Sequence, residues 1–217
     1  MSHAPDLNKS AKSWTRRKQA RPGEILEAAL KVFAEKGFAA ARMEDIAARA
    51  GVTKGTIYLY FPSKEEVFKT LIRESIGATL ADVAEQAAKF EGSTREFLTM
   101  FLTIVARFLE RGEFAMVPKI IVGESGNFPE LARFHRAEVV DKALAMMSGI
   151  IARGIARGEV RELPPEYVAR LCIAPVILSA IWRTTFARFD TVPFDYQKFL
   201  ATHLDVLLKG LAPEESA

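Results

Sequence analysis

Residues 43–64 decide the fold, and they read MEDIAARAGVTKGTIYLYFPSK. The first half of this stretch carries an apolar stripe at helical spacing, formed by Ile46, Ala47 and Ala50. Gly51 is expected to end this helix because the chain must turn there through a positive φ, and Thr53 is suited to N-cap a second helix. The stretch therefore predicts two short helices joined by a tight turn, which is the layout of a helix-turn-helix.

The second helix has an inner and an outer face. Ile57 and Phe61 are four residues apart and are expected to face the core, and Pro62 cannot continue the helix. The outer face is then formed by Lys54, Thr56, Tyr58 and Leu59. Such side chains can neutralise phosphates, hydrogen-bond to base edges or touch a thymine methyl group, so the pattern predicts double-stranded DNA as a partner.

Residues 22–71 resemble the N-terminal DNA-binding domain of the TetR (tetracycline-repressor-like) family of bacterial regulators. The matching segments are residues 25–29, 33–38, 45–47, 51–61 and 64–65. The resemblance implies an all-α, nine-helix architecture with a three-helix DNA-binding domain and a helical ligand-binding and dimerisation bundle. It implies DNA contacts, with Tyr58 and Lys64 on phosphates, from Thr53, Lys54, Gly55, Thr56, Tyr58, Leu59, Tyr60 and Lys64, and the charge of Arg42 makes it a further candidate.

One position departs from the family pattern. The helix before the turn commonly opens with Thr or Ser in this family, whereas Ala41 and Arg42 stand there in this chain. Arginine cannot N-cap a helix, which costs about 1 kcal/mol, although its charge can replace the phosphate contact. Tyr58 and Tyr60 also have a second interpretation, as half-buried core residues with solvated hydroxyls.

Composition and charge agree with a DNA-binding protein. The chain has 217 residues, 49% of them hydrophobic and 26% charged, which is typical of a soluble protein and leaves room for one small and one larger domain. Residues 1–64 hold 12 basic and 6 acidic side chains, a net charge of +6, whereas the remaining residues have a net charge of −3. Positive charge is therefore concentrated in the part that contains the helix-turn-helix.

The same composition restricts the cellular compartment. The single cysteine, Cys172, excludes an intrachain disulfide, fits a reducing compartment and is expected to be a buried packing residue. The N-terminus is basic and polar, so no secretory signal is expected. The longest apolar run, residues 171–182, contains Pro175 and is too short for a membrane span. We therefore expect a cytoplasmic protein with no membrane partner.

The chain is expected to consist of a flexible basic arm (1–20), a helix-turn-helix domain (21–63) and a ligand-binding and dimerisation domain (64–213). The predicted helices span about 22–36, 43–50, 54–61, 64–89, 94–111, 113–123, 127–157, 166–189 and 194–211. No strand pattern competes. The arm has two interpretations, either a DNA minor-groove contact or a solvated tail.

A short recognition helix usually needs a second copy of the protein for specific binding, so a homodimer interface is expected. The last two helices are expected to form a homodimer interface, as the resemblance implies, although their apolar residues can equally close the core of one chain. The candidate interface residues are Ile177, Ile181, Phe199, His203, Val206 and Leu207.

The larger domain is expected to bind an apolar or aromatic small-molecule effector that weakens DNA binding, again as the resemblance implies. The candidate ligand-binding residues are Met100, Phe101, Ile104, Phe108, Met116, His135, Met146, Trp182, Arg183 and Phe186. Each of them has the alternative interpretation of an ordinary core residue. An effector that favours a tilt of the helix over 64–89 would separate the two DNA-binding heads and release the DNA.

Other functions are less well supported by the sequence. It has no glycine-rich phosphate loop, no Cys/His metal spacing and no nucleophile with a recognisable base, so no catalytic residue, metal or cofactor is expected. A transcriptional activator, a non-specific DNA-binding protein of the same fold, and a helical protein that has lost DNA binding remain alternatives to a repressor.

Overall fold

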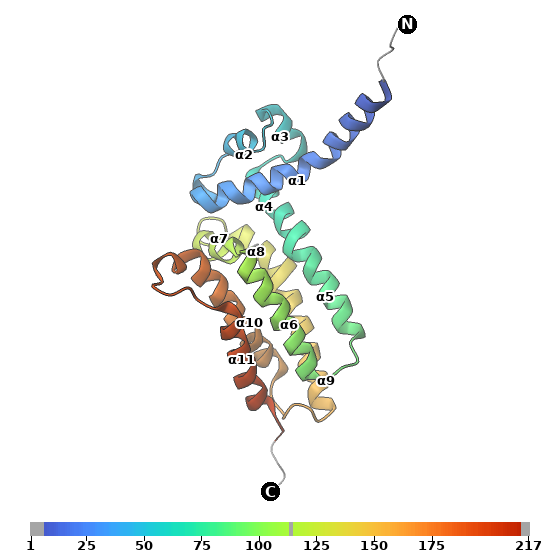
Figure 1. The fold of residues 1–217 in the computed structure, drawn as a ribbon, viewed down its shortest axis with the longest axis vertical. Coiled ribbons are helices and arrows are strands. Elements are labelled where there is room, and N and C mark those ends of the chain that lie inside the picture. Colours follow the sequence, from blue (N-terminus) through green and yellow to red (C-terminus); the bar gives the residue numbers. More distant parts are fainter. Residues whose placement is uncertain (1–6, 113–114, 214–217) are drawn as a thin grey trace. The chain divides into compact units, whose positions relative to one another are not determined.

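The computed structural model describes the backbone of residues 7–112 and 115–213, and side chains from Pro22 onward except at Ser75 and Arg111. Every regular element in this part of the chain is a helix (Figure 1). The chain divides into two compact units, Met1–Leu71 and Ile72–Ala217. The boundary therefore follows Leu71, whereas the sequence placed it after Ser63.

The first unit contains the predicted helix-turn-helix. Its helices are α1 (Leu7–Ala40), α2 (Met43–Arg49), α3 (Lys54–Tyr60) and α4 (Lys64–Ile72). A cluster of three fully buried rings, Phe33, Phe38 and Phe68, holds α1 and α4 together, with centroids 5.3–5.8 Å apart. Ile46 and Ile57 are also fully buried, so α2 and α3 are fixed against the same core.

Helix α1 begins earlier than predicted. The sequence suggested a flexible arm over 1–20 and a helix that starts at Pro22, but the helix begins at Leu7 and continues through Pro22. Residues 7–20 are rich in Lys, Arg, Ala and Gln, which are good helix formers, and Pro22 removes only one backbone donor. Side-chain positions of the arm lie outside the described residues. The predicted stop at Gly37 is confirmed by its positive φ of 77°.

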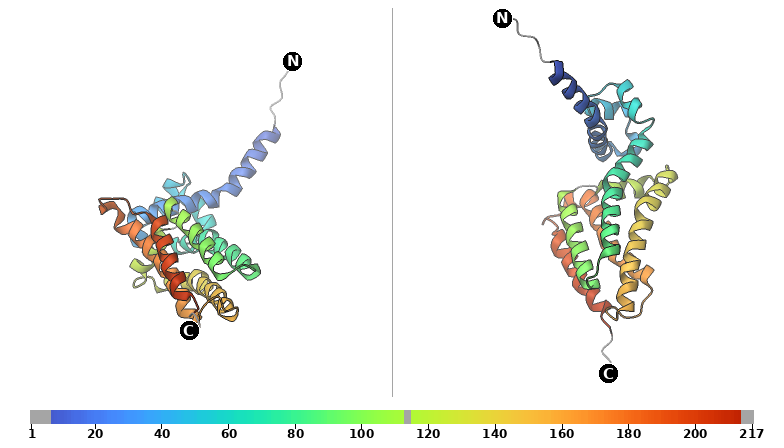
Figure 2. Two further views of the ribbon diagram at one scale, coloured as in Figure 1. Left: turned by 60° about the horizontal axis from the view of Figure 1, so that its bottom comes forward. Right: turned by 90° about the vertical axis from the view of Figure 1, so that its right-hand side faces the viewer.

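The second unit is a bundle of long helices with two shorter ones at one end. The long helices are α5 (Ala78–Lys89), α6 (Thr94–Arg111), α9 (Asp141–Ala156), α10 (Pro165–Thr185) and α11 (Tyr196–Leu211). They lie side by side, with α6 against α11 and α9 against both α5 and α10 (Figures 1 and 2). The shorter helices are α7 (Met116–Glu124) and α8 (Pro129–His135), and a 3₁₀ turn, η3 (Ala187–Phe189), follows α10.

Two of the predicted helices contain a π-helical turn. The segment η1 (Arg73–Gly77) joins α4 to α5, and η2 (Arg136–Val140) joins α8 to α9, without a break in either helix. If each such helix is taken as one, the described residues form nine α-helices, as predicted. The 3.6-residue period cannot reveal a π turn, because one extra residue barely alters the apolar pattern.

Helix α10 contains Pro175, as the predicted helix over 166–189 does, but it differs from the expectation for the apolar run 171–182. Pro175 lies inside this helix without ending it, so that by length and composition alone α10 could cross a membrane, contrary to the sequence-based estimate. Such a helix is weak evidence for a span, because core helices of soluble proteins pass the same test. Cys172 lies fully buried on α10, which confirms the expected packing role, and burial raises the pKa of its thiol to about 12.

Candidate DNA-binding surface and ligand cavity

The turn between α2 and α3 is built as the sequence predicts. Gly51 has a φ of 66°, and the Thr53 hydroxyl accepts the Thr56 backbone N–H at 3.1 Å, which caps α3. Ile57 and Phe61 are buried and hold the inner face of α3. The turn therefore fixes which residues of α3 face outward.

The outer face of α3 is open to solvent. Leu59 is 84% exposed and Tyr58 is 43% exposed, whereas Tyr60 is only partly exposed. Leu59 is therefore accessible to a partner along most of its side chain. At Gly55 a Cβ atom would meet only the Thr53 hydroxyl, at 3.9 Å, so space in the protein does not require glycine there.

Lys54 has an acidic partner that the sequence analysis missed. Its ammonium lies 2.6 Å from a carboxylate oxygen of Glu44 on α2, and both side chains are substantially exposed. The contact lowers the pKa of Glu44 and raises that of Lys54. The predicted DNA-binding surface therefore carries a carboxylate beside its recognition lysine. The sequence signal for this ion pair was an acidic residue, Glu44, at the start of the helix that precedes the turn.

Lys64 has a structural role in addition to any phosphate contact. Its ammonium donates to the carbonyl oxygens of Phe38, Ala39 and Ala41 at 2.9, 2.9 and 3.2 Å, and it lies 4.8 Å from the centre of the Phe38 ring. An ammonium has three N–H donors, and these carbonyls can engage all of them. Lys64 therefore ties the start of α4 to the chain that follows Gly37.

Arg42 occupies the N-cap position of α2 and is exposed, as predicted. Its side chain cannot accept a hydrogen bond, but its backbone N–H donates to the Asp45 carboxylate at 3.2 Å. Half of a capping box is thus present, which offsets part of the expected loss of helix stability. The Arg42 guanidinium takes no part in the cap and is exposed, so it is available for a phosphate contact.

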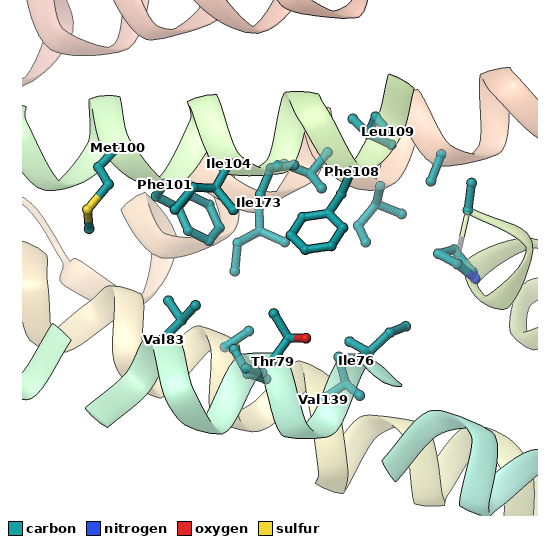
Figure 3. A pocket seen from close by; sticks show the side chains of 18 of the residues that line it. Ile76, Thr79, Val83, Met100, Phe101, Ile104, Phe108, Leu109, Val139 and Ile173 are labelled. Atoms are coloured by element: carbon teal, nitrogen blue, oxygen red, sulfur yellow. The ribbon is translucent and has the colours of Figure 1, made fainter. Parts of the chain in front are cut away.

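The second unit contains an apolar cavity of about 260 Å³, partly open to solvent. Figure 3 shows Phe101, Ile104 and Phe108 of α6 projecting toward Ile76, Thr79 and Val83 on η1 and α5. Helices α7, α8, α9 and α10 and segment η2 complete the wall. The lining residues are Ile76, Thr79, Leu80, Val83, Gln86, Phe97, Met100, Phe101, Ile104, Val105, Phe108, Leu109, Ala115, Pro118, His135, Val139, Ala143, Ile173, Val176, Ile177 and Ala180.

The cavity includes half of the candidate ligand-binding residues. Met100, Phe101, Ile104, Phe108 and His135 line it. The others lie elsewhere, namely Met116, Met146, Trp182, Arg183 and Phe186.

The excluded residues have different surroundings. Met146 packs against the core cluster that contains Met147 and Cys172. The Trp182 indole N–H donates to the Asp190 carboxylate at 2.9 Å, and the centroids of the Trp182 and Phe186 rings are 5.2 Å apart. Most of these residues were candidates because they are apolar or aromatic, and that character cannot distinguish a cavity wall from a packed core or, for the 47% exposed Phe186, from the surface.

His135 is the buried polar residue of the cavity wall. It is 7% exposed, and its Nδ1 has no hydrogen-bond partner among the described residues. Burial lowers the pKa of His135 to about 4, so the imidazole is neutral at pH 7. His135 is one of the candidate ligand-binding residues, and its burial in the cavity wall excludes a solvated position on its helix.

The candidate dimer residues divide between core and surface. Leu207 is buried in the core, and Phe199 and Ile181 are half-buried. Ile177 lines the cavity, His203 is half-buried with its Nε2 lacking a partner among the described residues, and Val206 is 63% exposed.

A stripe along one face of α10 is more exposed than most of those candidates. Its members are Tyr167, Leu171 and Leu178, each more than half exposed. Spacings of four and seven residues place them on the same side of the helix.

Comparisons with known proteins match both units of the chain. Residues 25–71 match the family profile "Bacterial regulatory proteins, tetR family", and residues 90–191 match "Tetracyclin repressor-like, C-terminal domain". The fatty acid metabolism regulator protein of Bacillus subtilis is 29% identical over 89% of this chain and 98% of its own length. The uncharacterised HTH-type transcriptional regulator YfiR of the same organism is 31% identical over 68% of this chain and 72% of its own.

A solved structure extends the likeness to the fold. The transcriptional regulator FadR from Bacillus subtilis, in complex with stearoyl-CoA, superposes with a TM-score of 0.71 at 26% identity, over 87% of this chain and 98% of that one. Both family profiles, the exposed α3 and the helical second unit lead to the same conclusion. This chain belongs to the TetR family of bacterial regulatory proteins, and it is a DNA-binding transcriptional regulator rather than an enzyme.

Proposed function

We propose that this regulator is a cytoplasmic homodimeric repressor that leaves a palindromic operator when a fatty-acyl compound enters the cavity of its second unit. The observation that carries the proposal is the cavity between α5 and α6, whose wall is almost entirely apolar. Two similar proteins agree in kind, since one is named a fatty acid metabolism regulator and one was solved with stearoyl-CoA. The charged part of an acyl-CoA would remain outside this cavity.

The DNA-binding part of the proposal rests on α3. Its exposed residues suit a major groove, in which Lys54 can reach guanine O6 and N7 or a phosphate and Leu59 can contact a thymine methyl group. Tyr58 and Arg42 are both exposed, which supports phosphate contacts from their side chains. Two such helices on half-sites one turn of DNA apart would read a palindrome.

The second copy is proposed to bind along α10. The exposed Tyr167, Leu171 and Leu178 lie on one helix face, and Val206 of α11 is also exposed. An apolar stripe of this length on a soluble regulator is typical of a subunit interface. Two-fold pairing of such stripes would form a helical bundle across the dimer.

Selection of bound duplexes from a random pool, followed by titration of the selected operator with palmitoyl-CoA, tests the proposal. Palmitoyl-CoA is expected to release the operator from the wild type. Ile104→Trp fills the cavity and is expected to keep operator affinity but lose the response. Val122→Trp is the control, because Val122 is 65% exposed on α7 and does not line the cavity. Release by free CoA alone, or an undiminished response of Ile104→Trp, would contradict the proposal.

A further inference from the structure

The cavity wall contains few polar groups and none that is charged. Among the 21 described residues that line it, no Lys, Arg, Asp or Glu occurs. The polar ones are Thr79, Gln86 and His135; Thr79 and Gln86 share the cavity-lining face of α5 but are solvent-exposed, whereas His135 is buried. His135 is therefore the buried polar side chain that the cavity wall offers to a ligand.

The buried position of His135 needs an explanation. A buried polar atom without a hydrogen-bond partner is unfavourable and rare in folded proteins. The Nδ1 atom of His135 is such an atom among the described residues. A phenylalanine or leucine at this position would avoid the penalty, so the imidazole is expected to have a partner in a liganded state.

The charge state of His135 restricts what that partner is. A neutral imidazole has one N–H donor and one acceptor nitrogen, so Nδ1 can serve either purpose according to the tautomer. A hydroxyl, phenol or carbonyl group suits it. A carboxylate would be buried without a cation in this wall, which is strongly unfavourable.

We propose that His135 is the hydrogen-bonding anchor of the cavity and that the buried part of the effector is an uncharged apolar body with one hydroxyl, phenol or carbonyl group. The inference rests on the proposed effector function and names the ligand chemistry of that site. An acyl thioester fits it through its carbonyl oxygen, whereas a free fatty acid with a buried carboxylate does not.

Three probes of matched shape test the inference: butylbenzene, 4-butylphenol and 4-butylbenzoate. Isothermal titration of the full-length protein is expected to give about tenfold tighter binding of the phenol than of the hydrocarbon, and no binding of the benzoate. His135→Phe is expected to abolish the preference for the phenol while it keeps butylbenzene binding. Thr79→Val is expected to retain the preference.

Because His135 is buried, His135→Phe could lose the preference through misfolding, and a second variant controls for this. His135→Gln keeps a hydrogen-bonding side chain and is expected to restore part of the preference, and thermal melts of both variants check that they fold. A preference that survives in His135→Phe, or tighter binding of the benzoate than of the phenol, would overturn the inference.

Operator release, measured separately, distinguishes this inference from the proposed function. If the probes show the predicted preference but neither they nor palmitoyl-CoA release the operator, the anchor is supported and the proposed release fails. If palmitoyl-CoA releases the operator and the probes bind without preference, only the anchor is overturned. If no probe binds and palmitoyl-CoA has no effect, both are wrong.

Discussion

Lys54 of α3 already contacts a carboxylate before DNA is present. Glu44→Gln removes the charge from that partner, and we expect the freed lysine to bind phosphates of any sequence. Affinity for non-specific duplex should rise several-fold, the specificity ratio should fall, and the salt dependence should steepen by about one phosphate contact. Fluorescence anisotropy over a series of salt concentrations measures all three.

Glu85→Gln is the matched control for this substitution. Glu85 also lies 2.6 Å from a lysine, Lys89, on an exposed helix of the second unit. Both variants change the net charge equally, so equal effects on DNA binding would show that Glu44 acts only through total charge.

Gly55 tests how closely the backbone of α3 approaches DNA. Gly55→Ala adds one methyl group that has space in the free protein, and it should stabilise the helix by up to about 1 kcal/mol. We nevertheless expect weaker operator binding, because the methyl group would lie between α3 and the groove. Gly149→Ala on α9 is the control with equally open surroundings. Unchanged affinity of Gly55→Ala would place this turn of α3 away from DNA.

His135 should make the stability of the second unit depend on pH. Its pKa is lowered from 6.5 to about 4 in the folded state, so between these values the unfolded chain binds more protons. The free energy of unfolding should therefore fall as the pH decreases through this window, by up to about 3 kcal/mol.

Denaturant titrations at several pH values measure this slope. His135→Phe should lose most of it. His203, whose pKa is also lowered by burial, should account for a remainder. An equal slope in both proteins would show that His135 does not contribute.

At the scale of elements, Lys64 adds hydrogen bonds to the aromatic packing that joins α4 to α1. Lys64→Met keeps the apolar stem but removes the hydrogen bonds to three backbone carbonyls. We expect the first unit to lose about 1–3 kcal/mol of stability, with the second unit unaffected. Denaturant unfolding measured on both units provides the test. Full stability combined with lost operator affinity would instead support the phosphate contact that the family resemblance implies.

The elements also show what the sequence could and could not predict. The Thr53 cap and the Gly51 turn depend on residues within three positions of one another, so the local pattern was sufficient. The bonds from Lys64 to Phe38 and Ala39 span more than twenty residues and have no local signature. Five of the ten candidate ligand-binding residues line the cavity and five do not, for a similar reason. Met100 and Met146 have the same apolar character, and only the packing of distant helices leaves space beside Met100.

For the whole molecule, the exposed stripe on α10 determines the expected oligomeric state. Leu171→Lys places a charge in the middle of this stripe, and we expect it to convert a dimer to monomers with little loss of helicity. Val122→Lys is the control, since it adds the same charge at an exposed apolar residue of α7. Sedimentation measures the molecular mass of each variant. A Leu171→Lys protein that remains dimeric would locate the interface elsewhere.

The most direct test of the central claim is methylation interference on the selected operator, since methylation of guanine N7 blocks the major groove alone. If two copies of α3 read adjacent turns, interference should occur in two symmetric clusters whose centres are about 10 base pairs apart, or a multiple of that spacing. Leu171→Lys should weaken binding to both clusters together. Interference at a single cluster, or none at any guanine N7, would contradict the account.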